Sequence, residues 1–180
     1  MLTLVLVRPT LHNSRMATTA FKGETVQTVG ELPGIGTSAP DFILVGSDLT
    51  DITNDRFSGK RIVLNIFPSL DTGVCANSVR EFNKRAAGLE NAVVICASAD
   101  LPFAAERFCV AEGIENVVTG SAFRSRFGSV YGVTMANGPL AGLLARSVVV
   151  IDADGTVRYT ELVPEITTEP DYDAALEALA

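Results

Sequence analysis

Cys75 is the residue best placed for chemistry, because it opens a predicted helix directly after a buried strand and a turn. The strand is expected over residues 61–67, and the loop that follows runs from Pro68 to Val74. Backbone N–H groups at a helix start lack helical partners and the helix dipole is positive there, so a thiolate is stabilised. The hydroxyl of Thr72, three residues earlier, can turn toward the sulfur. The alternative is a small buried cysteine that caps an ordinary helix.

The chain lacks the partners that other cysteine enzymes need. Its single histidine, His12, lies in an N-terminal segment without a periodic pattern, so a Cys–His hydrolase or transferase has no base in the folded domain. No Cys-x-x-Cys motif occurs, which argues against a disulfide reductase. What remains is a thiolate activated by fixed positive charge and hydrogen bonds, and such a thiolate suits attack on a weak O–O bond.

Arg146 is the strongest candidate for that fixed charge. Arginine stays charged at all ordinary pH values and presents several donors. Arg146 begins an apolar strand that continues to Ile151, and a charge beside such a strand needs a partner. The alternative is an arginine at a strand end whose guanidinium reaches solvent.

The other two cysteines and the remaining motifs give weaker signals. Cys96 lies in the middle of an apolar strand and Cys109 on a predicted helix, and packing explains either position. Three separated cysteines without histidine do not match a zinc site. Asp152-x-Asp154-Gly155 lacks the later ligands of a calcium loop and is interpreted as a turn. No glycine-rich nucleotide motif is present, so we expect neither a metal nor a cofactor.

The alternation of apolar runs and helical spacing predicts an α/β domain with a mixed sheet and helices on both faces. A hairpin is expected from residues 18–22 and 25–29 around Gly23-Glu24. Further strands are predicted at residues 42–45, 61–67, 92–98, 146–151 and 156–162. Helices are predicted at residues 75–87, 102–112, 123–131 and 171–179; Pro102 starts the second of these and Gly113 ends it.

Composition limits the possible partners. The chain has 180 residues, 47 % of them hydrophobic, which suits one domain with a sizeable core. Its net charge of -7 argues against nucleic acid and anionic membranes, and no apolar run is long enough for a membrane span. An odd, sparse set of three cysteines favours a reducing compartment, the cytoplasm. We expect residues 1–15 to be a disordered, dispensable arm or a mis-called start before Met16, and residues 16–180 to form the domain.

Several segments together resemble the thiol peroxidase subfamily of the peroxiredoxins. Pro68-x-x-x-Thr72-x-x-Cys75 is similar to the peroxidatic motif of the whole family. The subfamily resemblance covers the chain from about Phe21 to the C-terminus, and it is carried by residues 65–75, 98–109, 138–146 and 165–172.

The resemblance implies a thioredoxin-like fold with an N-terminal β-hairpin, a homodimer, and an atypical two-cysteine mechanism within one subunit. It makes Cys75 the peroxidatic and Cys109 the resolving cysteine, with Thr72 and Arg146 positioning thiolate and peroxide. Pro68 would shield the site from water. Cys96 matches a family cysteine that turnover does not require. Val110 stands where the family commonly has glycine, which could alter how easily the helix unwinds.

The implied activity is reduction of hydrogen peroxide and of alkyl or lipid hydroperoxides through a Cys75 sulfenic acid and a Cys75–Cys109 disulfide, recycled by thioredoxin. Such an enzyme serves antioxidant defence and redox homeostasis. Two alternatives remain: a redox-sensing module that passes oxidation to a partner through Cys75, and another enzyme of the thioredoxin fold, such as a disulfide oxidoreductase. A glutathione peroxidase normally has catalytic glutamine and tryptophan, and this chain has no tryptophan.

Overall fold

A computed structural model describes residues 15–180, so the predictions for the N-terminal arm and His12 concern residues that lie almost wholly outside the described part. The strands are β1 (Thr18–Phe21), β2 (Glu24–Gln27), β3 (Ile43–Val45), β4 (Asp51–Thr53), β5 (Arg61–Ile66), β6 (Ala92–Ser98), β7 (Val118–Ser121), β8 (Ser147–Ile151) and β9 (Val157–Leu162). The helices are η1 (Asn54–Phe57, a 3-10 helix), α1 (Gly73–Ala86), α2 (Pro102–Glu112), α3 (Phe127–Val130) and α4 (Tyr172–Glu177).

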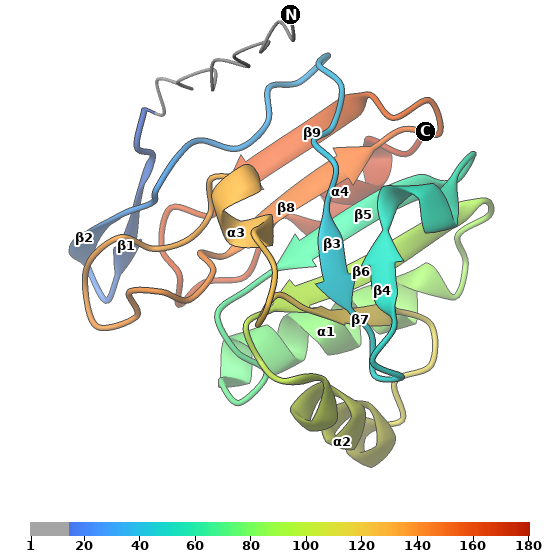
Figure 1. Cartoon of the computed structure of the whole chain (residues 1–180), viewed down its shortest axis with the longest axis horizontal. Coiled ribbons are helices and arrows are strands. Elements are labelled where there is room, and N and C mark those ends of the chain that lie inside the picture. Colours follow the sequence, from blue (N-terminus) through green and yellow to red (C-terminus); the bar gives the residue numbers. More distant parts are fainter. Residues whose placement is uncertain (1–14) are drawn as a thin grey trace, which may run out of the picture.

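Seven strands form one mixed sheet in the order β4-β3-β7-β6-β5-β8-β9, and β1 and β2 form a separate hairpin (Figure 1). The central strands β5, β6 and β7 run parallel, whereas β8 and β9 are antiparallel to their neighbours. Asn65, near the C-terminal end of β5, lies between Cys96 of β6 and Val148 of β8. The strands on either side of the site therefore come from distant parts of the sequence.

Both faces of the sheet are covered, because successive side chains of β5 point in opposite directions. Val63 packs with Val79 and Phe82 of α1 on one face, and α4 and α2 contribute to the same cluster. Leu64 packs on the other face with Phe127 of α3. The predicted mixed sheet with helices on both faces is confirmed.

Helix α2 and strand β6 have the predicted bounds, while other elements differ. The hairpin turns at Lys22-Gly23 rather than at Gly23-Glu24, because both Lys22 and Gly23 adopt positive φ angles of 53° and 83°. The short helix begins only at Phe127, since turns occupy the residues from Phe123 onward. The predictions omitted β4 and β7. Both are short, β7 contains Gly120, and such strands are defined by pairing more than by apolar pattern.

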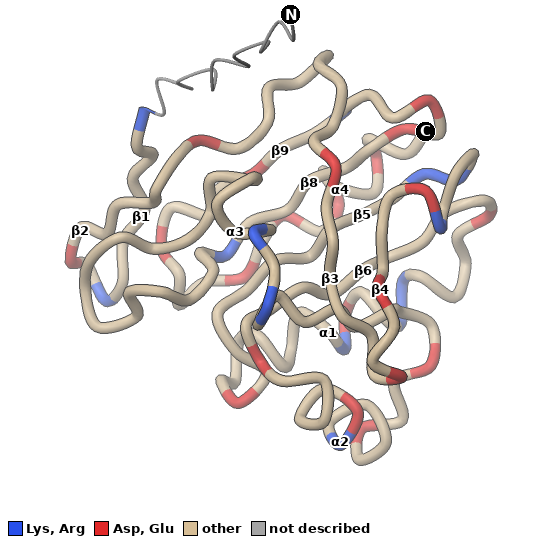
Figure 2. The backbone as a smooth tube through the Cα atoms, viewed as in Figure 1, with Lys and Arg blue, Asp and Glu red and all other residues tan. Residues whose placement is uncertain are grey.

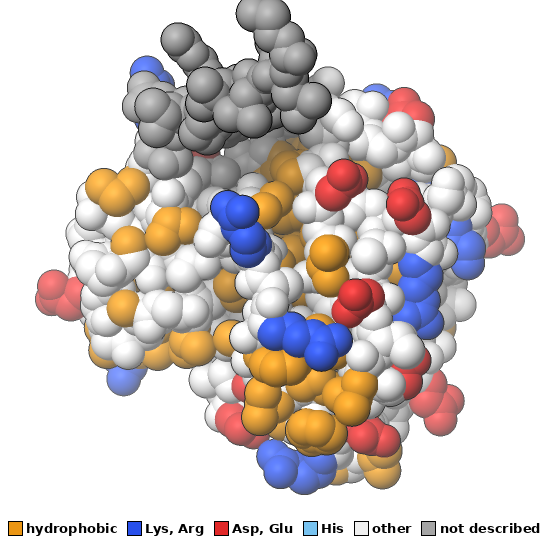
Figure 3. All heavy atoms as spheres, viewed as in Figure 1, with side chains coloured by type: hydrophobic (Ala, Val, Ile, Leu, Met, Phe, Trp, Pro, Cys, Tyr) orange, Lys and Arg blue, Asp and Glu red, His pale blue; other side chains and the backbone are white. Residues whose placement is uncertain are grey.

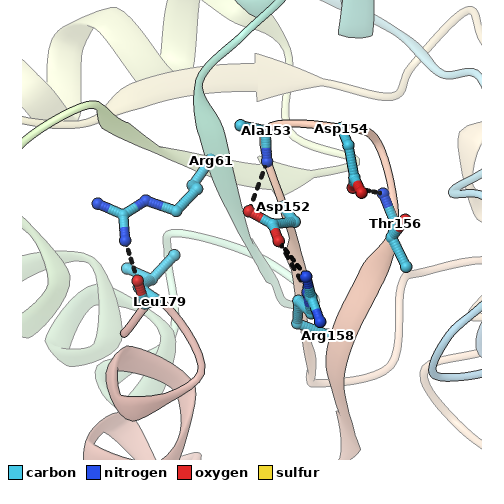
Figure 4. A network of polar contacts seen from close by, with 7 residues as sticks. All are labelled: Arg61, Asp152, Ala153, Asp154, Thr156, Arg158 and Leu179. Carbon is cyan, nitrogen blue, oxygen red and sulfur yellow. Dashed lines mark hydrogen bonds and ion pairs between the residues drawn. The ribbon is translucent and has the colours of Figure 1, made fainter.

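The turn between β8 and β9 is closed by protein groups alone (Figure 4). Arg158 Nε donates to Asp152 Oδ2 at 2.8 Å, and the other Asp152 oxygen accepts from the Ala153 N–H at 2.8 Å. Asp154 Oδ1 accepts from the Thr156 N–H at 2.8 Å. These bonds lower the pKa of both aspartates. Their carboxylates are therefore satisfied as turn groups, as predicted.

Charge and hydropathy on the described surface are mixed. Lys and Arg residues are scattered among Asp and Glu residues over the described backbone and do not form one basic stripe (Figure 2). None of the helices within residues 15–180 combines the length and apolar character that a membrane crossing requires.

Candidate active site

Cys75 is the third residue of α1 and is completely buried. Thr72 is the N-cap residue and has an extended backbone, so the chain turns sharply into the helix at the end of the loop after β5. The Cys75 side chain belongs to the same apolar cluster as Phe67 and Val79. The predicted position at a helix start is confirmed, with the helix beginning two residues before Cys75.

Arg146 lies directly beside the sulfur. Its Nη2 is 3.3 Å from Cys75 Sγ, and its Nε donates to the Ile166 carbonyl at 2.9 Å. The side chain is only 1 % exposed, and Nη1 has no hydrogen-bond partner. Within residues 15–180, no carboxylate forms a salt bridge with it. The alternative in which Arg146 reaches solvent is therefore wrong.

The charge balance of this pair defines its chemistry. A buried guanidinium without a counter-ion is costly, and a negative charge at Cys75 Sγ offsets that cost. The free Nη1 provides a further donor for an oxygen bound next to the sulfur. The site is thus built to stabilise an anionic sulfur and a developing negative charge beside it.

The loop before α1 is held by a residue that the sequence analysis did not single out. Asp100, which follows β6, accepts from Ser69 Oγ and from the Leu70 N–H, both at 2.7 Å, and from Ser98 Oγ at 2.8 Å. Pro68 is buried at the bend after Phe67. Only the position of Asp100 at the end of the neighbouring parallel strand could have indicated this contact.

Thr72 does not contact the sulfur in this conformation. Its side chain is exposed, and Oγ1 donates to the Ser69 carbonyl at 3.1 Å. The hydroxyl therefore faces the loop, so the structure brings Arg146 and Cys75 together but leaves Thr72 at the rim.

The other two cysteines have different surroundings. Cys96 is buried under α1, and burial raises the pKa of its thiol to about 12, although Asn65 Nδ2 lies 3.6 Å from its sulfur. Cys109 is half-buried on α2; burial raises the pKa of its thiol too, and a hydrogen bond with Thr119 acts in the opposite direction. All three cysteines are free thiols.

Helix α2 is loosely attached to the domain. Only Pro102 and Ala105 are buried, and Phe103 is 62 % exposed. From its sequence we expected the burial of Phe103 and Phe108 to hold this helix closed; for Phe103 this is wrong, because no other element of residues 15–180 covers its side chain. Phe108 is partly buried, and the Arg80 guanidinium lies 5.9 Å from its ring centre.

Two polar contacts join the end of α2 to α1. Arg80 Nε lies 2.8 Å from Glu112 Oε2. Asn83 Oδ1 accepts from the N–H groups of Glu115 at 3.0 Å and Asn116 at 2.7 Å. These contacts link the C-terminal end of α2 and the loop after it to α1.

No metal site accompanies these groups in the described part of the chain. Among residues 15–180, His, Cys, Asp and Glu side chains form no cluster of three or more that could hold an ion.

Comparison with known proteins gives consistent matches. The family model described as Redoxin matches residues 35–176. Thiol peroxidases of Mycobacterium tuberculosis and Corynebacterium glutamicum are 61 % and 58 % identical to the chain over 164 residues, which is 91 % of this chain and 99 % of each relative.

Solved structures show the same architecture. A peroxiredoxin-like protein from Aquifex aeolicus is similar with a TM-score of 0.85 at 42 % identity, over 91 % of this chain and 96 % of that one. A thiol peroxidase from Chromobacterium violaceum has a TM-score of 0.82 at 24 % identity, over 89 % and 94 % of the two chains. The predicted thioredoxin-like fold with an N-terminal hairpin is confirmed.

Proposed function

Because the chain belongs to the Redoxin family and its relatives are thiol peroxidases, we propose that it is a thiol-dependent peroxidase that reduces hydrogen peroxide and organic hydroperoxides at Cys75. The observation that carries this proposal is the buried Arg146 guanidinium, which is 3.3 Å from Cys75 Sγ and has no carboxylate partner among residues 15–180. A structural cysteine in an apolar core does not need a buried cation beside it.

In the first step, the Cys75 thiolate attacks the terminal oxygen of the peroxide. The O–O bond breaks, sulfur is oxidised to a sulfenic acid, and the leaving oxygen takes a proton and departs as water or alcohol. Arg146 Nη2 stabilises the thiolate, and the free Nη1 is available to the oxygen atoms as negative charge develops.

Thr72 and Pro68 complete the site in this proposal. The exposed Thr72 hydroxyl exchanges its Ser69 partner for a peroxide oxygen, a rotation that disrupts no buried contact. Pro68 has no N–H group and is buried at the bend, so it keeps water from the sulfur without competing for hydrogen bonds.

In the second step, the Cys109 thiol attacks the sulfenic sulfur. An S–S bond forms, the S–O bond breaks, and water leaves. Because the two cysteines lie on different helices, local unwinding has to bring their sulfur atoms within bonding geometry. The short, poorly buried α2 is the element with the lower cost of opening.

Reduction of the disulfide completes the cycle. Thioredoxin transfers two electrons by thiol–disulfide exchange and returns Cys75 and Cys109 to thiols.

The three free thiols of the chain fit a reducing compartment, so we place the enzyme in the cytoplasm.

The chain is further proposed to act as a homodimer. Ile43, Phe123 and Val130 are each at least 40 % exposed, and Ile43 and Val130 line a groove of about 470 Å³ that Arg124 and Asp51 border. Hydrophobic side chains gather with basic ones above α2 in Figure 3. Phe123→Glu should shift the mass measured by light scattering from dimer to monomer; a wild-type chain that stays monomeric would contradict this.

Turnover of a hydroperoxide panel with catalytic amounts of thioredoxin tests the proposed function. The wild-type chain should turn over many equivalents, with alkyl and lipid hydroperoxides preferred over hydrogen peroxide. Cys75→Ser should be inactive by orders of magnitude while keeping the same circular dichroism spectrum and melting temperature. A single oxidation that stalls until a partner protein is added would instead identify a redox-sensing module.

A further inference from the structure

Asn65 is a polar residue in a strand that is otherwise apolar. It is the last but one residue of β5 and is completely buried, with Leu64 and Ile66 on either side. Burying an amide is costly unless it is hydrogen-bonded, and Asn65 Oδ1 has no partner. An apolar residue would suit the core better, so the amide requires another explanation.

The Asn65 side chain points under the reactive helix. Its Nδ2 donates to Ser78 Oγ at 3.2 Å, and Ser78 is completely buried one turn after Cys75. Ser78 Oγ in turn donates to the Cys75 carbonyl at 2.9 Å. Because the amide nitrogen of Asn65 can only donate, it occupies a lone pair of the Ser78 hydroxyl and leaves the hydroxyl proton for Cys75.

This chain of two hydrogen bonds fastens the first turn of α1 to the central strand. One end is the rigid β5 backbone, paired on both sides, and the other is the carbonyl of the reactive cysteine itself. Arg146, which immediately precedes β8, the other neighbour of β5, contacts the Cys75 sulfur. The sulfur and the carbonyl of Cys75 are thus both held relative to the same sheet.

We propose that Asn65 and Ser78 are a positioning pair that holds Cys75 against Arg146 for reaction with peroxide and must release Cys75 before the disulfide can form. This inference rests on the proposed function. Attack on peroxide needs the first turn of α1 to be ordered. Because Cys75 is completely buried, bonding to Cys109 needs this turn to loosen as well as α2 to open. The pair therefore favours the first step and opposes the second.

The test is Ser78→Ala in the full chain, with the two steps measured separately by rapid acid quench and mass spectrometry. A buried hydrogen bond of ordinary net strength corresponds to a roughly 2- to 10-fold change in an equilibrium. Oxidation of Cys75 by a limiting peroxide should slow by about that factor. Conversion of the sulfenic acid to the Cys75–Cys109 disulfide should accelerate by a similar factor, and excess peroxide should yield less sulfinic acid.

Thr28→Val is the matched control. Thr28 is also completely buried, and its hydroxyl donates to the Gly30 carbonyl at 2.7 Å, but it lies beyond the hairpin strand β2. It should lose a comparable amount of thermal stability and leave both rates at the wild-type value. Equal changes in the control variant, or an unchanged disulfide rate in Ser78→Ala, would overturn the proposal.

Asn65→Leu provides a second variant that keeps the Ser78 hydroxyl and replaces the amide with an apolar group of similar size. It should change both rates in the same directions as Ser78→Ala. If neither variant folds, the pair is structural and the positioning role is wrong. If the wild-type chain itself forms no Cys75–Cys109 disulfide, the resolving step of the proposed function fails instead.

Discussion

The two helices that carry the proposed reactive cysteines are built differently. Helix α1 places Cys75, Val79 and Phe82 in the core and extends over 14 residues. Helix α2 has 11 residues, buries only Pro102 and Ala105, and exposes Phe103 to solvent. Helix α1 contributes its buried face to the core cluster, whereas α2 contributes only Ala105 and the partly buried Phe108.

The two helices suit two different steps of the proposed cycle, stabilisation of the Cys75 thiolate and formation of the disulfide. A thiolate in a buried site needs a fixed positive charge to offset the cost of burial, and Arg146 provides one beside Cys75. Forming a disulfide needs movement, which costs least where few apolar contacts are lost. In the proposed cycle, the peroxidatic Cys75 therefore lies on the tightly packed helix and the resolving Cys109 on the loosely packed one.

The largest effect on cycling is expected from removing Cys109, the cysteine on α2. Cys109→Ser should still react once with peroxide but lose thioredoxin-supported cycling, because no resolving thiol remains. Cys96→Ser is the control and should keep most of the cycling, since Cys96 lies within a sheet strand and its thiol pKa is raised to about 12. Peptide mapping of the oxidised wild-type chain should link Cys75 to Cys109. A dominant Cys75–Cys96 bond, or a disulfide between subunits, would refute the assignment.

The second largest effect is expected from removing the positive charge beside Cys75, which lies on α1. Arg146→Gln removes the cation beside Cys75 Sγ. The thiolate absorbance at neutral pH should fall, and oxidation by peroxide should slow about 100-fold, the scale seen when one preorganised donor is lost. Arg158→Gln, which removes an exposed guanidinium from the β8–β9 turn, is the control and should leave both quantities unchanged. If the thiolate absorbance and the oxidation rate of Arg146→Gln equal those of the wild type, another group stabilises the thiolate.

A smaller effect is expected at the contact between the two helices. Arg80→Ala removes the ion pair with Glu112 and the cation–π contact with Phe108. Exposed pairs contribute about 0.2–1 kcal/mol, so α2 should open more often and the disulfide should form roughly 2- to 3-fold faster. Arg85→Ala is matched on the same helix but pairs with Asp173 of α4, so the disulfide rate should not change. Equal rates of disulfide formation in Arg80→Ala and Arg85→Ala would mean that the contact of Arg80 with Glu112 does not limit the opening of α2.

The smallest effect concerns the loop that supports Arg146. Glu165 accepts hydrogen bonds from the Gly23 N–H at 2.9 Å and from Thr167, and these lower its pKa from 4.5 to about 2. A pKa lowered in the folded state adds stability above about pH 4.5, and this stability disappears as the pH falls toward 2.

Glu165→Gln should therefore lower the urea midpoint slightly near neutral pH and make stability less dependent on pH in the acid range, because the charged acceptor is gone. Glu177→Gln changes an exposed carboxylate of α4 and should follow the wild-type curve. A Glu165→Gln curve parallel to the wild type would show that the hairpin contact does not stabilise the charged form.

Local signals in the sequence determined much of the fold. Pro102 and Gly113 set the bounds of α2, and the apolar run of residues 92–98 defined β6, because these signals act over a few residues. The start of α1 at the motif ending in Cys75 was also predictable. Strands β4 and β7 were not, since their short sequences become strands by pairing, β4 with β3 and β7 with β6 and, at one position, β3.

Some features of the candidate site could likewise be predicted from the sequence, and others could not. The sequence by itself determined that Cys75 begins a helix in a domain without a usable histidine, and it limited the activating group to a cation such as Arg146. Only the tertiary structure decided that the guanidinium turns inward to Cys75, that Asp100 holds the preceding loop, and that Ser78 is bonded to Asn65. These contacts join residues 13 to 71 positions apart, and their geometry is set by how the strands pair and how α1 packs on the sheet.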